Sequence, residues 1–159
     1  MYREARSMLA HVLEAKLSPH RFKTVEPTGE LSKRGVKKLL HRKTWITNSG
    51  VVLAEPGVVA LRDYIACIRR EAGPFLGSSR WNPLGLQVVL VMTDAAPVPP
   101  LHALEACVDG LDTHGIVIQS VFALDPSARQ WAAGRTWQFV TGKFQDAIAA
   151  AIKESLSRD

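Results

Sequence analysis

Two apolar segments in the second half of the chain place the tightest constraint on its fold. Leu86–Met92 is apolar at every position except Gln87 and contains three valines, and Ile116–Leu124 is also rich in branched residues. Such runs are typical of strands in a sheet that is covered on both faces. Between them, apolar residues recur at the spacing of a helix, at Leu101, Leu104, Val108 and Leu111. The C-terminal half is therefore predicted to contain a parallel β-α-β unit.

The other segments complete an α/β pattern with the approximate order αβαββαβαβ(α)βα. Apolar spacing predicts helices over residues 3–17, 31–42, 58–71 and 143–156, and a short helix around residues 127–132. Strands are predicted at residues 20–26 and 136–140, and as a pair around the turn Asn48-Ser49-Gly50. We expect one domain over residues 1–159, in which a mixed sheet lies between helices. Residues 73–85 contain three glycines, two prolines and two serines, and are expected to form a surface loop or a hinge.

The sequence predicts a cytoplasmic protein that does not enter a membrane. Its longest apolar runs are far shorter than the ~20 residues of a membrane-spanning helix. Residues 1–6 carry charges of both signs where a signal peptide would have an apolar core. Cys67 and Cys107 are too far apart to form a metal or redox motif.

Positive charge is concentrated in the first part of the chain. Residues 1–43 contain 11 Lys or Arg and four Glu, a net charge of +7, whereas the remaining residues contain nine Lys or Arg and 11 acids, a net charge of −2. A basic segment beside a nearly neutral one often marks an anionic partner such as nucleic acid. A basic surface without a partner has the same composition.

The predicted helix over residues 31–42 gathers much of this charge on one side. Its apolar residues Val36, Leu39 and Leu40 fall within a narrow arc, and its cations face away from them. We expect nucleic acid to contact the following residues: Lys33, Arg34, Lys37, Lys38, Arg42, Lys43 and Trp45. The cations would neutralise successive phosphates, and the tryptophan would stack on an exposed base. No base-reading motif is present, so the sequence does not distinguish DNA from RNA.

A second hypothesis is a protein-interaction adaptor that uses the loops at its strand ends. Trp81 lies among turn residues and is the tryptophan most expected at a surface contact. A third, weaker hypothesis is an enzyme that binds a divalent metal between Asp94 and Asp125, which follow the two apolar strands. Phosphate-loop and nucleophile-elbow motifs are missing. The sequence favours a binding protein over an enzyme, and it assigns no catalytic residue and no cofactor.

Two family resemblances rest on short motifs. Residues 88–94 (Val-Val-Leu-Val-Met-Thr-Asp), the following helix and Gly115-Ile116-Val117 resemble the later half of a von Willebrand factor type A domain. Residues 139–144 (Phe-Val-Thr-Gly-Lys-Phe) and the amphipathic helix that follows are similar to that family's last strand and helix. The resemblance covers residues 86–157 and implies a binding domain. That family holds its metal with Asp-x-Ser-x-Ser on its first strand. The nearest string here, residues 125–129, lacks the second serine.

The order helix, strand, hairpin, helix, strand resembles the restriction-endonuclease core. That family carries an acidic residue and then Glu-x-Lys on its central hairpin. In this chain Glu55 is followed by Pro56 and Gly57. The resemblance therefore does not imply an active nuclease.

Overall fold

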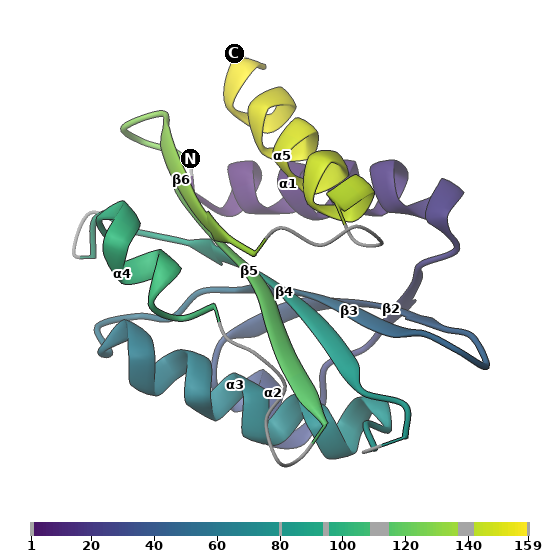
Figure 1. The fold of residues 1–159 in the computed structure, drawn as a ribbon. Helices are drawn as coiled ribbons and strands as arrows, with labels where there is room; N and C mark the ends of the chain where they lie inside the picture. Colours follow the sequence, from purple (N-terminus) through teal and green to yellow (C-terminus); the bar gives the residue numbers. More distant parts are fainter. Residues whose placement is uncertain (1, 80, 94–95, 109–114, 137–141, 159) are drawn as a thin grey trace.

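A six-stranded mixed sheet runs through the molecule and carries helices on both faces (Figure 1). The structure is a computed structural model, and it describes residues 2–79, 81–93, 96–108, 115–136 and 142–158. Its elements are, in chain order, α1 (Tyr2–Leu17), the 3-10 helix η1 (Ser18–His20), β1 (Lys23–Val25), α2 (Gly29–Lys33), β2 (Val36–Lys43), β3 (Asn48–Ala54), α3 (Leu61–Leu76), β4 (Leu84–Val91), α4 (Leu101–Glu105), β5 (Ile116–Asp125), β6 (Gln130–Arg135) and α5 (Gly142–Ser157). No helix of the described residues combines the length and the apolar character needed to cross a bilayer.

The strands follow one another across the sheet in chain order, from β1 at one edge to β6 at the other. Strands β1, β2 and β3 are antiparallel neighbours, β3, β4 and β5 are parallel, and β6 runs antiparallel to β5. The helices α3 and α4 lie in the connections between the parallel strands. These pairings confirm the predicted mixed α/β fold and the parallel β-α-β unit of the C-terminal half.

The sheet separates two hydrophobic cores, because successive side chains of a strand point to opposite faces. Figure 1 shows α1 and α5 on one face of the sheet, and α2, α3 and α4 on the other. Phe122 and Val89 belong to the core below α1 and α5. Val88 and Val121 belong to the core below the other three helices. Every residue of β4 is buried, as the apolar run in its sequence predicted.

The predicted helix over residues 31–42 is wrong, because the segment divides into the end of α2 and the strand β2. Gly35 lies between them with φ +84°, a left-handed conformation that ends a helix and that glycine adopts at little cost. Strand β2 lies between β1 and β3, and its register shifts between Val36 and Lys38. Val36 and Leu39 therefore reach one core and Leu40 the other. Because this strand has a bulge and two buried faces, its sequence has the same apolar spacing as a helix.

The turn of the central hairpin also lies elsewhere than predicted. Asn48, Ser49 and Gly50 belong to β3, and the chain reverses at residues 44–47. The N–H of Thr44 donates to the carbonyl oxygen of Thr47 at 2.7 Å. Hydroxyl bonds of Thr44 stabilise this turn, so the Asn-Ser-Gly string is not needed for the reversal.

The predicted short helix over residues 127–132 is wrong, since β6 begins at Gln130. Asp125 stabilises the turn before β6. Its Oδ1 atom accepts hydrogen bonds from the N–H groups of Ser127 at 2.9 Å and of Ala128 at 3.2 Å. A side chain that can cap a helix here caps a hairpin turn instead. Of the predicted strand over residues 136–140, Thr136 follows β6, and the rest lies outside the described residues.

Helix α3 begins and ends later than predicted. Gly73 and Pro74, which were expected to terminate it, lie in its last turn. The helix ends instead at Gly77, which has φ +69° and donates its N–H to the carbonyl oxygen of Gly73. The glycine- and proline-rich segment 73–85 is therefore divided among α3, a short connection and the start of β4.

Candidate nucleic-acid interface

The cations of the predicted basic helix are divided between the two ends of the sheet. We call the end at which β3, β4 and β5 begin the amino edge, and the end at which they finish the carboxyl edge. Lys33, Arg34 and Lys37 lie at the carboxyl edge, where β2 begins beside the end of β3. Arg42, Lys43 and Trp45 lie at the amino edge, with Lys38 nearer to the carboxyl edge. The structure therefore does not bring the seven predicted residues together.

Acidic side chains pair with most of the cations that lie away from the amino edge. The ammonium Nζ of Lys33 lies 2.9 Å from Glu30 Oε1, and that of Lys37 lies 3.8 Å from Glu55 Oε2. Lys38 Nζ donates to Glu14 Oε2 at 2.5 Å. This bond, together with one from Thr24, lowers the pKa of the Glu14 carboxyl. A phosphate would have to compete with these carboxylates for the three lysines.

Glu55 also ties the carboxyl edge to neighbouring elements. Its Oε1 atom lies 2.6 Å from Arg6 Nη1 on α1, and its N–H donates to the carbonyl oxygen of Gly35 at 3.0 Å. The hydroxyl of Tyr64 on α3 donates to the carbonyl oxygen of Arg34 at 2.6 Å, and burial raises the pKa of this hydroxyl. The start of β2 is thus held from both faces of the sheet.

At the amino edge, cations from β2 and α5 and a histidine lie around one aromatic ring. The Arg42 guanidinium lies 5.5 Å from the centre of the Phe144 ring on α5, and Lys143 Nζ lies 5.3 Å from it. The His20 ring meets the same ring edge-on at 5.5 Å. Arg21 follows His20, and Lys23 is the register partner of His41. We define the basic edge cluster as Arg21, Lys23, Arg42, Lys43 and Lys143.

The basic edge cluster has no acidic partner among the described residues. Arg42 donates from Nη1 to the hydroxyl of Thr47 at 3.2 Å, which leaves its charge uncompensated. Each segment that contributes to the cluster is free of acids over a long stretch: residues 15–25, 31–54 and 126–145 contain no Asp or Glu. Arg21, Lys23, Lys43 and Lys143 are exposed. The cluster is therefore a positive surface that is open to solvent.

Two tryptophans accompany this positive surface. Trp45, in the turn between β2 and β3, is 91% exposed, and Trp81, just before β4, is 94% exposed. Trp131, in contrast, stacks on Phe122 at 6.4 Å between ring centres. The expectation that Trp81 lies at the surface agrees with this exposure. Trp45 and Trp81 present nearly whole aromatic faces to solvent.

Sequence reasoning missed three members of the basic edge cluster. Arg21 and Lys23 lie in the acid-free stretch 15–25, which is a signal that the sequence contains. Lys143 also lies in an acid-free stretch, 126–145, but only the fold brings the start of α5 beside β2. The predicted basic block, residues 1–43, therefore contributed part of a surface that the C-terminal helix completes.

The proposed metal site between Asp94 and Asp125 cannot be assembled from the described residues. Asp125 is 8% exposed, and its Oδ1 atom accepts the two N–H groups of the β5–β6 turn. Asp94 lies outside the described residues. Within the part of the chain that the structure describes, no group of three or more His, Cys, Asp or Glu could hold a metal ion. Metal binding by the two aspartates stays a prediction.

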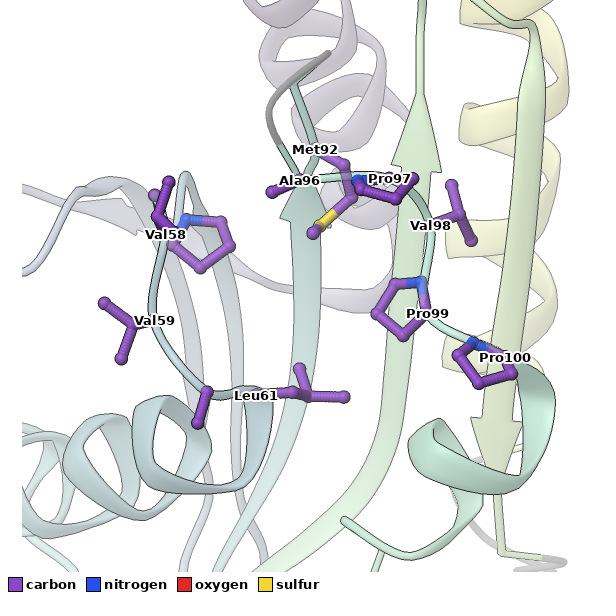
Figure 2. A pocket seen from close by; sticks show the side chains of 12 residues that line it. Val58, Val59, Leu61, Met92, Ala96, Pro97, Val98, Pro99 and Pro100 are labelled. Atoms are coloured by element: carbon purple, nitrogen blue, oxygen red, sulfur yellow. The ribbon is translucent and has the colours of Figure 1, made fainter.

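An apolar groove lies at the carboxyl edge, between the loops that follow β3 and β4 (Figure 2). It has a volume of about 440 Å³ and is lined by residues 56–61, 92 and 96–100. Figure 2 shows Val58 and Val59 on one side, the run Pro97–Pro100 on the other, and Met92 between them. None of the described lining residues can be charged, so they supply no acid, base or metal ligand. The groove is suited to apolar contacts.

Comparisons of the chain with models of protein families, with curated proteins and with solved structures find no match. The resemblances to the von Willebrand factor type A domain and to the restriction-endonuclease core rest on sequence motifs and element order alone.

Proposed function

We propose that this protein binds nucleic acid through phosphate contacts at the amino edge. The observation that carries the proposal is the basic edge cluster, in which five cations from three parts of the chain lie at one end of the sheet without an acidic partner among the described residues. Phosphates bind such surfaces because neutralised phosphates release their counterions. The strand β2 and the start of α5 take the role that the sequence assigned to a basic helix.

The cluster fits contact with the backbone better than reading of bases. Its members come from the residue after η1 and from β1, β2 and α5, so they are spread along one end of the sheet. Lysine and arginine side chains that contact phosphates fix register but carry no sequence information. We therefore expect binding that tolerates many sequences and weakens steeply with salt.

The test compares two variants that lose the same charge from opposite ends of the sheet. One replaces Arg21, Lys43 and Lys143 with alanine, and the control replaces Lys33, Arg34 and Lys37. Binding of a fluorescein-labelled 20-nucleotide oligomer is followed by fluorescence anisotropy at 50 mM salt. With three phosphate contacts removed, the first variant should bind on the order of a hundredfold more weakly, and its salt slope should fall by about 2. The control should bind within about twofold of the natural chain.

Equal losses in the two variants would show that net charge, and not this surface, determines binding. Failure of the natural chain to bind DNA or RNA oligomers at 50 mM salt would overturn the proposal. Thermal melting of each variant checks that the fold persists, which we expect because all six replaced side chains are exposed.

A protein-interaction adaptor is the second candidate function, and the apolar groove at the carboxyl edge favours it. Val58, 83% exposed, and Val59 are apolar side chains at the surface of this groove. An apolar groove of this kind is suited to bury apolar side chains of a partner. Such binding would change little with salt, and Val58→Asp would weaken it without an effect on oligonucleotide binding.

We infer that the protein acts as a binding protein in the cytoplasm, without a catalytic step and without a cofactor. Cys67 and Cys107 are both free thiols, as is usual for proteins of a reducing compartment. The described lining of the groove and the basic edge cluster contain no nucleophile paired with a base.

A further inference from the structure

Short hydrogen-bonded turns hold Trp45 and Trp81 at the amino edge. In the first turn, Thr44 Oγ1 accepts the N–H of Thr47 at 2.9 Å. In the second, Ser79 Oγ accepts the N–H of Asn82 at 3.0 Å, and the main chains of these two residues bond in both directions, at 3.2 and 3.3 Å. A hydroxyl that accepts an N–H three residues later stabilises each turn. The two exposed rings are thus attached to backbone of fixed shape.

The two turns are neighbours in the sheet. Trp45 lies three residues before Asn48, the first residue of β3, and Trp81 lies three residues before Leu84, the first residue of β4. Asn48 and Leu84 are register partners in adjacent parallel strands, which lie about 4.8 Å apart. Asn48 Nδ2 also donates to the carbonyl oxygen of Leu76 at 3.4 Å, which ties the hairpin to the end of α3. The two tryptophan turns therefore leave the sheet side by side.

Lys43 lies close to the chain at both turns. It ends β2, directly before the first turn, and its Nζ atom lies 3.3 Å from the position of a Cβ on Gly77, which precedes the second turn. Within the described residues Lys43 has no ion pair. Lys43 thus directly precedes the turn of Trp45, and its ammonium group lies near the chain that leads into the turn of Trp81.

We propose that Trp45 and Trp81 stack on unpaired bases while Lys43 binds the phosphate between them, so that the amino edge prefers single-stranded nucleic acid to a duplex. The inference rests on the proposed phosphate binding at the same edge. Aromatic platforms beside a positive track are the usual means of holding single strands. In a duplex the faces of the bases are already covered by their neighbours, so the two rings would gain nothing from it.

An anionic lipid surface is a different partner that exposed tryptophans and cations can bind. The arrangement favours nucleic acid, because Trp45, Ile46 and Trp81 are the strongly exposed large apolar side chains that the described part of this edge presents. They belong to two separate turns, and Lys43 directly precedes the first of them. Insertion into lipid would bury its ammonium among hydrocarbon.

The test measures binding of labelled dT20, of a 20-base-pair duplex and of vesicles with 30% phosphatidylserine by the natural chain, Trp45→Ala, Trp81→Ala and the double variant. Val58→Ala is the matched control, because it removes an equally exposed apolar side chain at the carboxyl edge. Each tryptophan variant should bind dT20 roughly 5- to 100-fold more weakly than the natural chain, and the duplex within about twofold. Addition of dT20 should also quench tryptophan fluorescence, and the double variant should lose this quenching.

The outcomes separate this inference from the proposed function. Equal affinity for dT20 and duplex, unchanged in the double variant, would overturn base stacking while phosphate binding stands. No binding of either oligomer at low salt would overturn both proposals. Vesicle binding that requires the tryptophans, without binding of dT20, would replace the single strand by a lipid surface.

Discussion

The two ends of the sheet carry cations in similar numbers but in different surroundings. At the carboxyl edge, Arg6 and Lys37 share Glu55, and Lys33 pairs with Glu30. At the amino edge, the basic edge cluster has aromatic neighbours and no acid within the described residues. Most cations of the carboxyl edge are thus held in ion pairs, with Arg34 as the exception among the described residues, whereas the amino edge is an open positive surface. Ion pairing, more than the number of cations, therefore decides which surface is available to bind a phosphate.

The backbone differs between the two ends in the same way. Gly35, at the carboxyl edge, faces main chain: a Cβ there would lie 2.2 Å from the carbonyl oxygen of Glu55. Gly77, at the amino edge, has a similar positive φ, but a Cβ there would meet only the mobile end of a side chain, Lys43 Nζ, at 3.3 Å. Gly35 is thus closely packed against main chain, whereas the space beside Gly77 can adjust.

The largest expected effect follows from this pair of glycines. Gly35→Ala should lower the free energy of unfolding by about 3 kcal/mol, because the left-handed backbone costs about 1 kcal/mol and overpacking against main chain costs about 2 kcal/mol more. Gly77→Ala should lower it by about 1 kcal/mol, since Lys43 can swing aside. Urea unfolding followed by circular dichroism measures both. Equal losses in the two variants would contradict the difference in packing between the ends.

The sequence predicts an element well where that element buries either a single face or both of its faces completely. Helix α1 and strands β4 and β5 lie within two residues of their predicted bounds, because their apolar patterns have a single interpretation. Strand β2 could not be predicted, since its bulge and its two buried faces reproduce helical spacing. Strand β6 was missed because Asp125-Pro126-Ser127 suits a helix start as well as a hairpin turn.

The candidate site was predictable only in part. The acid-free run around Arg42, Lys43 and Trp45 and the turn residues around Trp81 are visible in the sequence. Whether a lysine is paired is not, because the partners of Lys37 and Lys38 come from β3 and α1. Pairing depends on contacts between distant segments, and such contacts exist only in the folded chain.

Removal of an acidic partner at the carboxyl edge should have a smaller effect, on oligomer affinity. Glu55→Gln removes the carboxylate between Arg6 and Lys37, so the carboxyl edge should become an additional phosphate-binding surface. In the background of Arg21, Lys43 and Lys143 replaced by alanine, we expect oligomer affinity at 50 mM salt to rise roughly fivefold. Stability should fall by no more than about 1 kcal/mol, because these side chains are partly exposed.

Glu105→Gln is the control for this variant, since it changes the net charge equally but lies on an exposed position of α4. Anisotropy titrations of the two variants side by side give the comparison. An equal gain with Glu105→Gln would mean that net charge alone governs binding, and the distinction between paired and open cations would then fail.

The smallest expected effect concerns the bond between Glu14 on α1 and Lys38 on β2. Since hydrogen bonds from Lys38 and then Thr24 lower the pKa of Glu14 on folding, its carboxylate stabilises the fold above the ordinary pKa of 4.5. This contribution is lost as the pH falls through the lowered pKa. Glu14→Gln should therefore lower the free energy of unfolding at pH 7 by less than about 1 kcal/mol, because both side chains are partly exposed, and the loss should shrink as the pH falls below 4.5, as thermal melting over this pH range would show. A loss of stability in Glu14→Gln that persists at pH 2 to 3 would show that Glu14 acts through the packing of α1 on β2 and not through its charge. Lys38 would then count among the cations without an effective acidic partner.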